Sequence, residues 1–248
     1  MLMIKIVNLS LVGVIVIIGF AYFFNSGETI SSEVEVTGVV EEKILSEQTN
    51  VSEDHKIAEE MQLDVPLLNQ MDSPRLYNGC EVTSLAMILN YKGISVTKNQ
   101  LAQEITRVPL QYSNGENGNP NTGFVGNMED GPGLGVYHEP IFELAQNYLN
   151  AADLTNTSFD QLIEEVANGN PVWVITTSTF APVSAFETWQ TPEGTVDITY
   201  NMHSVVITGY DSTNIYINNP YGTKNQKVDR ESFIQAWEQM GKQAVVLY

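Results

Sequence analysis

Residues 78–91 read NGCEVTSLAMILNY, and this stretch predicts the first helix of the globular part of the chain. Asn78 is a residue type that caps helices, and Glu81 three positions later completes a capping-box pattern. Apolar residues then recur at helical spacing, and Gly93 suits the end of the helix. With this start, Cys80 is the second residue of the first turn, where free N–H groups and the helix dipole favour a thiolate. The adjacent Glu81 has the opposite effect on the thiol.

Cys80 is the single cysteine of the chain, so no disulfide bond can form within it. An unpaired thiol outside the cytosol is exposed to oxidation unless it is buried or used in chemistry. A small buried core residue is the common structural role of such a cysteine. The alternative is a nucleophile, which needs a base close by.

The chain contains three histidines, and His203 is the one best placed to act as that base. It begins an apolar stretch, residues 203–210, that predicts a strand, and a turn leads into a second strand at residues 214–218. Antiparallel pairing brings His203 close to Asn218 and Asn219, which end the second strand. An imidazole oriented by an amide completes a thiol triad. The alternative interpretation is a strand-end histidine beside an ordinary Asn-Pro turn.

Gln70 lies ten residues before Cys80, at the end of a predicted lead-in strand over residues 63–68. A side-chain amide at this place is able to join the backbone N–H of Cys80 in an oxyanion hole. Taken alone, Gln70 is equally consistent with a polar residue near a turn.

The rest of the pattern predicts an α+β domain with an antiparallel sheet, because helices come first and strands follow. Residues 112–135 are rich in Gly, Asn and Pro, which predicts a long loop. Three further helices are predicted to begin at Thr97, Pro140 and Ser158, and one more covers residues 231–240. The other predicted strands are residues 171–177, 195–200 and 244–248.

Three parts of the chain resemble the bacterial cysteine-peptidase family 39-like domain, whose relatives include the bacteriocin-leader peptidases fused to ABC exporters. The resemblance covers residues 62–248, and the order Gln, Cys, His, Asn matches a papain-like site. The similar segments are VPLLNQ at residues 65–70 with the cysteine segment at 78–91, PNTGFVG at residues 120–126 with GVY at 135–137, and residues 203–220.

The resemblance implies a papain-like fold, in which N-terminal helices pack on an antiparallel sheet, and a cysteine-type peptidase. Cys80 would be the nucleophile, and His203 the general base and then the general acid. Asn219 would orient the imidazole, and Gln70 would supply an oxyanion donor. The family often has Asp directly before the proline where this chain has Asn219, but papain-like enzymes also use Asn.

Strand parity leaves the third member of the site open. If Tyr210 pairs with Ile215, the side chain on the same face as His203 is that of Asn218 and not that of Asn219. A β-bulge would reverse this parity. The family pattern favours Asn219.

Three activities are compatible with these residues. The first is hydrolysis of peptide or cell-wall-linked amide bonds through an acyl-enzyme. The second is a catalytically inactive binding module on the same fold. The third is transfer of the acyl group to an amine or another acceptor. No cofactor is expected, and one Cys with three scattered His disfavours a zinc site.

The N-terminal part predicts attachment to a membrane. Residues 1–25 are expected to form an anchor, because no charge lies between Lys5 and Glu28 and the apolar run can cross a bilayer. The positive-inside rule then places the C-terminal domain, residues 61–248, outside the cell. If the segment is a signal peptide and is cleaved, the protein is secreted. Residues 26–60 contain ten Asp or Glu and two Lys, which predicts an acidic flexible spacer.

The net charge of −19 lacks the basic footprint that binds phosphate backbones, so nucleic acid is not an expected partner. Phosphate-binding loops of the Walker type are missing from the sequence, so no ABC transporter is expected in this chain. The expected partners are a peptide or cell-envelope amide substrate and the membrane.

Overall fold

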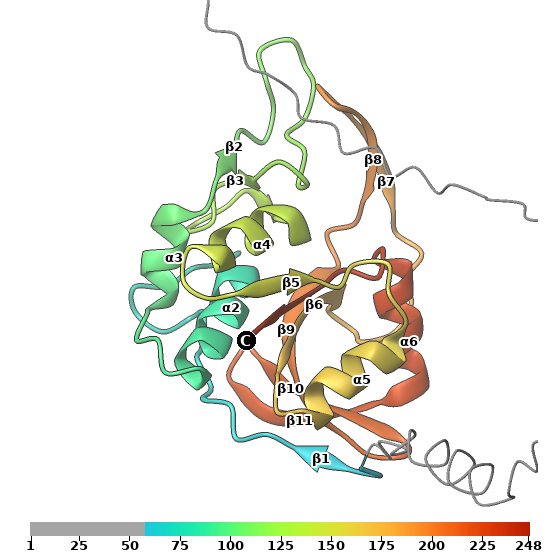
Figure 1. The fold of residues 1–248 in the computed structure, drawn as a ribbon. Helices are drawn as coiled ribbons and strands as arrows, with labels where there is room; N and C mark the ends of the chain where they lie inside the picture. Colours follow the sequence, from blue (N-terminus) through green and yellow to red (C-terminus); the bar gives the residue numbers. More distant parts are fainter. Residues whose placement is uncertain (1–57) are drawn as a thin grey trace, which may run out of the picture. The chain divides into compact units, whose positions relative to one another are not determined.

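The computed structural model describes residues 58–248 (Figure 1). The predicted anchor and the predicted spacer up to residue 57 lie outside the described residues. Within the described part, no helix is both long enough and apolar enough to cross a bilayer.

One seven-stranded sheet organises the described residues (Figure 1). Every strand pair in it is antiparallel, which confirms the α+β class with an antiparallel sheet. Its strands are β1 (Met61–Gln62), β5 (Ala151–Asp153), β6 (Val172–Thr177), β9 (Met202–Tyr210), β10 (Asn214–Asn219), β11 (Thr223–Asp229) and β12 (Ala244–Leu247). They run in the order β11-β10-β9-β6-β12-β5, and β1 pairs with the free part of β9.

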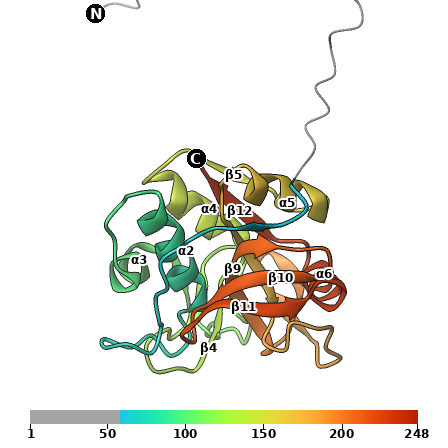
Figure 2. The ribbon, with the colours of Figure 1, turned by 90° about the horizontal axis from the view of Figure 1, so that it is seen from below.

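Helices cover both faces of this sheet. They are α2 (Cys80–Tyr91), α3 (Lys98–Glu104), α4 (His138–Gln146), α5 (Phe159–Ala167) and α6 (Arg230–Gln239). Figures 1 and 2 show α2, α3 and α4 on one side of the sheet and α5 and α6 on the other. The predicted capping boxes at Thr97 and Ser158 are both present, with both reciprocal hydrogen bonds. Helix α4 begins at His138, two residues before Pro140.

Helix α2 starts differently from the sequence prediction. Cys80 is its first residue, and the glycine before it is the N-cap without a side-chain hydrogen bond. The Asn78 amide instead donates to the Asn127 carbonyl at 3.0 Å. The Glu81 carboxylate accepts the Val136 N–H at 2.9 Å. The predicted capping box is therefore wrong, because both side chains bind a neighbouring loop.

Other short elements were not evident in the sequence, except β8 (Gly194–Ile198), which overlaps the predicted strand at residues 195–200. The predicted strand at residues 63–68 is wrong. Beyond β1, the Leu63 N–H still donates to the Thr208 carbonyl of β9 at 2.7 Å, but residues 63–68 are not a strand. The predicted loop at 112–135 contains β3 (Phe124–Gly126) and β4 (Gly133–Gly135), which form a three-stranded sheet with β2 (Arg107–Val108). A separate hairpin consists of β7 (Glu187–Thr191) and β8 (Gly194–Ile198).

Helix α2 lies inside the core. All ten of its residues from 80 to 89 are buried, and it packs on β9 and β6. A helix that is apolar on all sides is stable only when it is covered on all sides. The surrounding core includes the fully buried rings of Trp173, Trp237 and Phe233. This packing holds the start of α2 beside the start of β9.

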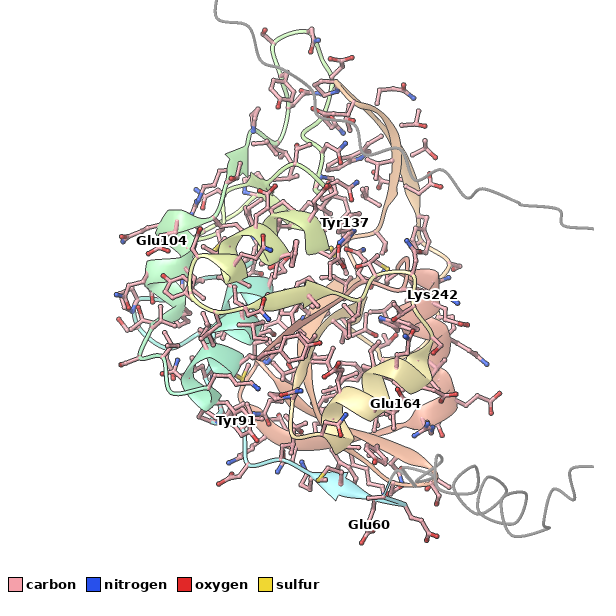
Figure 3. All side chains as sticks on the ribbon, viewed as in Figure 1. Glu60, Tyr91, Glu104, Tyr137, Glu164 and Lys242 are labelled. Carbon is pink, nitrogen blue, oxygen red and sulfur yellow. The ribbon has the colours of Figure 1, made fainter. Side chains whose placement is uncertain are left out.

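Most acidic side chains of the described part lie in solvent. Glu60, Glu104 and Glu164 are exposed and are labelled at the surface in Figure 3. Glu81 is the one buried carboxyl group within residues 58–248, and it is fully buried. The negative charge of the domain is therefore solvated, except for one group next to Cys80.

Candidate active site

The imidazole of His203 is held by an asparagine from the neighbouring strand. His203 Nε2 lies 3.0 Å from Asn219 Oδ1, and both side chains are buried. The Asn219 amide nitrogen donates to Gln226 Oε1 at 2.9 Å, which fixes the orientation of the amide. Because the amide oxygen only accepts, Nε2 of His203 carries the proton. Nδ1 is then the acceptor nitrogen of the neutral ring.

A bulge in β9 determines which asparagine meets His203. Tyr210 pairs with Ile215, as the parity argument assumed. Beyond Gly209 the register shifts, and Thr208 is the extra residue without a partner in β10. This shift brings Asn219 to the imidazole side of the hairpin. The bulge that the sequence left open is therefore present.

Asn218 has a structural role on the other side of β10. Its amide nitrogen donates to the Val65 carbonyl at 3.0 Å. Its oxygen accepts the Asn225 N–H at 3.0 Å. These bonds attach the segment before Gln70 to the sheet.

Two aromatic rings cover the imidazole of His203. The Tyr221 ring stacks on it at 5.0 Å between centroids and 16° between planes, and the Phe180 ring lies at 6.2 Å. Tyr221 is 56% exposed, so it forms the solvent side of this group. Tyr221 was not evident from the sequence, because it lies in the turn after β10, where strand periodicity does not apply.

Cys80 is an unpaired, buried cysteine at the start of α2. Its sulfur accepts a hydrogen bond from the backbone N–H of Ser204, the residue that follows His203. The nucleophile and the base predicted from the sequence are thus brought to the same place, where α2 meets β9.

The surroundings of Cys80 favour the neutral thiol. Burial raises the pKa of Cys80 well above its ordinary value, and the charge of Glu81 raises it further. The N–H groups of Ser204 and of Cys80 itself lower this pKa, but they do not offset the burial. The helix start therefore does not produce a thiolate by itself.

The base is also neutral at rest. Burial lowers the pKa of His203 to about 4, and the hydrogen bond to Asn219 opposes this shift. Within the described residues, Nδ1 has no hydrogen-bond partner. The arrangement is a neutral thiol at the start of α2 and a neutral imidazole on the strand residue next to Ser204, whose N–H reaches the thiol sulfur.

Gln70 braces the chain on both sides of the site. Its backbone N–H donates to the Pro220 carbonyl at 2.8 Å. Its side-chain nitrogen donates to the carbonyls of Leu76 and Tyr77 at 3.2 and 2.9 Å. Its Oε1 is buried and has no partner in the described part of the chain. The structure therefore places Gln70 between the segment before Cys80 and the turn after β10, and its role as an oxyanion donor stays a prediction.

The described residues offer no cluster of three or more His, Cys, Asp or Glu that could hold a metal ion. His138, which lies outside this site, pairs through Nδ1 with Asp153 at 2.8 Å. The chemistry that the site can perform with its own groups is acid, base and nucleophilic chemistry.

Comparison with known proteins identifies the family of this chain. Residues 62–245 match the Peptidase_C39 like family. The chain belongs to this family. The uncharacterized protein YvpB of Bacillus subtilis (strain 168) is 60% identical over 187 residues, which are 75% of each chain.

A solved structure shares the fold of this family member. It is the crystal structure of a protein described as a C39-like peptidase from Bacillus anthracis, with 48% identity and a TM-score of 0.74. The match covers 77% of this chain and 98% of that chain. The family resemblance stated from the sequence and the fold of a C39-like peptidase are thus confirmed.

Proposed function

We propose that this C39-like protein is an active cysteine peptidase that uses Cys80, His203 and Asn219. One observation carries the proposal. Asn219 Oδ1 accepts a hydrogen bond from His203 Nε2–H, which leaves Nδ1 as the basic nitrogen. His203 directly precedes Ser204, whose N–H reaches the Cys80 sulfur. Family membership supports a peptidase, and this geometry supports the assignment of its groups.

The mechanism follows from the two neutral groups. As the Cys80 sulfur attacks a peptide carbonyl, its proton passes to His203 Nδ1. The imidazolium then returns this proton to the leaving amine, and an acyl-enzyme remains. Water then attacks the thioester while the same nitrogen takes its proton. The C–S bond breaks, the acid leaves, and the proton returns from His203 to the Cys80 sulfur. Asn219 holds the ring in one orientation throughout.

The oxyanion of the tetrahedral intermediate needs hydrogen-bond donors. The Cys80 backbone N–H is one, because the first N–H groups of a helix have no acceptor within it. We keep Gln70 as the second donor. To act, its amide must leave one of the two carbonyls that it now binds.

Hydrolysis of a diverse peptide pool in H₂¹⁸O tests this function. Wild type is expected to produce new peptide ends that carry ¹⁸O, and Cys80→Ala is not. Equal cleavage by both proteins would overturn the proposal. Products joined to added amines, in place of free acids, would indicate the acyl-transferring alternative.

We propose that the domain acts outside the cell, on peptides or on amides of the cell envelope. The apolar segment at 1–25 would anchor it, and the acidic segment at 26–60 would hold it away from the bilayer. Protease added to intact cells should then remove the domain. Protection of the domain until the cells are lysed would contradict this location.

A catalytically inactive binding module is the second candidate. The observation in its favour is the burial of Cys80, which is only 8% exposed and has a raised pKa. An inactive module predicts a thiol whose alkylation rate does not depend on His203.

A further inference from the structure

Glu81 is a buried group that the mechanism above does not use. It is fully buried, and it directly follows the nucleophile in α2. Cys80 Sγ lies 3.4 Å from Glu81 Oε2, within hydrogen-bond distance for sulfur. A carboxyl group that touches the reacting sulfur must either help or oppose its ionisation.

The Glu81 carboxyl group is fixed in position. Oε1 accepts the Val136 N–H at 2.9 Å, and the Glu81 carbonyl accepts the Trp173 indole N–H at 3.1 Å. The preceding Gly135 has no room for a side chain, because a Cβ there would lie 2.2 Å from Oε1. Oε1 is thus committed as an acceptor, and Oε2 is the oxygen that can carry a proton toward Cys80.

We propose that Glu81 is a further catalytic residue, which keeps a proton on Oε2 and donates it in a hydrogen bond to the Cys80 thiolate. The proposal rests on the peptidase function proposed above. When the thiol S–H bond breaks, the proton goes to His203 Nδ1, and Glu81 keeps its own proton. When Glu81 is ionised, Oε2 accepts the S–H group instead, and its charge opposes the thiolate.

Few other groups influence Glu81. Tyr221, from the turn after β10, is the other titratable group that interacts with both Cys80 and Glu81. His203 of β9 lies next to Ser204, whose N–H reaches the Cys80 sulfur. On α3, which packs on α2, Lys98 binds the carbonyls of Asp72 and Pro74, and Glu104 accepts from Tyr148. On α4, His138 binds Asp153, and Glu139 and Glu143 are exposed.

The electrostatics agree with this geometry. Burial raises the pKa of Glu81 to about 7, and the hydrogen bonds from Val136 and Cys80 oppose that shift. Near neutral pH the group therefore changes between the donor form and the acceptor form. As Glu81 ionises, the thiolate fraction of Cys80 should stop rising with pH, because the Glu81 charge opposes the thiolate.

Alkylation of the full-length protein by iodoacetamide, measured from pH 5.5 to 8, tests the proposal. Cys80 is the only thiol, so the signal belongs to it alone. Glu81→Gln keeps the acceptor oxygen and supplies a permanent N–H donor. At pH 8 this variant should react at least about tenfold faster than wild type, because only wild type loses its donor as Glu81 ionises. At pH 5.5 the two rates should agree within about twofold. A ratio that stays constant over the pH range would overturn the proposal.

A matched control is Glu139→Gln, which removes an exposed carboxylate from the first turn of α4. It should follow wild type at every pH. A second measurement covers the case in which Glu81→Gln fails to fold: infrared titration of the buried carboxyl in wild type and in Cys80→Ala. Coupling is reciprocal, so the Glu81 midpoint should rise when the thiol is removed. An unchanged midpoint would overturn the proposal.

These readouts separate the two proposals. Alkylation and infrared titration need no substrate, so a pH-dependent ratio without peptide hydrolysis would remove the peptidase function and leave the Glu81–Cys80 coupling. Peptide hydrolysis that depends on His203, together with a constant ratio, would remove the role of Glu81 alone.

Discussion

The two halves of the site differ in how their groups are satisfied. On the sheet side, His203 and Asn219 form a closed set of hydrogen bonds, with Gln226 behind the amide and Tyr221 over the ring. On the helix side, the Cys80 thiol faces one backbone N–H and one carboxyl group whose charged form opposes its ionisation. The base is thus oriented in advance, whereas the nucleophile depends on proton transfer.

The difference has an electrostatic consequence. Burial lowers the pKa of His203 to about 4 and raises that of Glu81 to about 7, since it disfavours the charged form of each. The two halves therefore respond to pH in opposite directions. A variant that removes His203 or Glu81 should therefore show the pH dependence that the remaining group causes.

The largest expected effect is on catalysis itself. His203→Gln removes the base but fills most of the same space, and we expect peptide hydrolysis to fall by about 10³- to 10⁴-fold. Steady-state hydrolysis of a peptide released in the ¹⁸O experiment measures this loss. A fall of less than tenfold in a folded variant would mean that His203 is not the base.

Removal of the orienting amide should have a smaller effect. Asn219→Ala breaks the 3.0 Å bond to Nε2 and leaves the ring free to turn, so kcat should fall by roughly 10²-fold with little change in KM. Asn219→Asp restores an acceptor oxygen and should recover part of the activity. Loss of activity from Asn218→Ala, with Asn219→Ala unaffected, would contradict the assignment.

Stability should reveal the Glu81 half separately. A raised carboxyl pKa contributes stability that is complete below about pH 4.5 and is lost as pH rises through about 7. Glu81→Gln lacks this loss. We compare the free energy of unfolding of Glu81→Gln with that of wild type by urea denaturation. From pH 4.5 to pH 8, this difference should change by about 3 kcal/mol in favour of the variant. A pH-independent difference would show that Glu81 does not titrate in the folded protein.

The His203 side chain should make the free energy of unfolding depend on pH in the opposite direction. A lowered histidine pKa contributes stability that is present above about pH 6.5 and is lost as pH falls through about 4. The free energy of unfolding of His203→Gln, compared with that of wild type, should therefore rise by up to about 3 kcal/mol as the pH is lowered from 6.5 to 4. The same urea series measures it, and parallel curves for both proteins would contradict the burial of a neutral imidazole.

The smallest effect on catalysis is expected from the Tyr221 ring, which stacks on His203. Tyr221→Ala removes the ring stacked on His203, which should cost about 1 kcal/mol of transition-state stabilisation, or about fivefold in kcat/KM. Tyr221→Phe keeps the ring and serves as the control. Equal losses in both variants would assign the effect to the hydroxyl group instead.

The sequence predicted the helix that carries Cys80, the hairpin that carries His203, and the two capping boxes at Thr97 and Ser158. These features depend on local patterns. Asn219 was predicted from the family pattern, whereas strand parity alone pointed to Asn218. The parity depends on the bulge at Thr208, and no residue type at that position predicts a bulge.

The burial of the Glu81 side chain could not be predicted from the sequence either. Its pattern with Asn78 is that of a capping box, but the loop at Val136 offers the carboxylate a donor, and a long-range contact replaces the local one. The short strands β3 and β4 were missed for a similar reason. They lie in a Gly-rich segment and are held mainly by pairing with distant residues.

The most direct test of the account is the rate at which iodoacetamide alkylates Cys80 at pH 7 in the folded full-length protein, compared between wild type and His203→Gln. If His203 Nδ1 takes the thiol proton, the variant should react at least about tenfold more slowly. Equal rates in the two proteins would show that Cys80 and His203 do not act together, and the cysteine-peptidase site proposed here would be wrong.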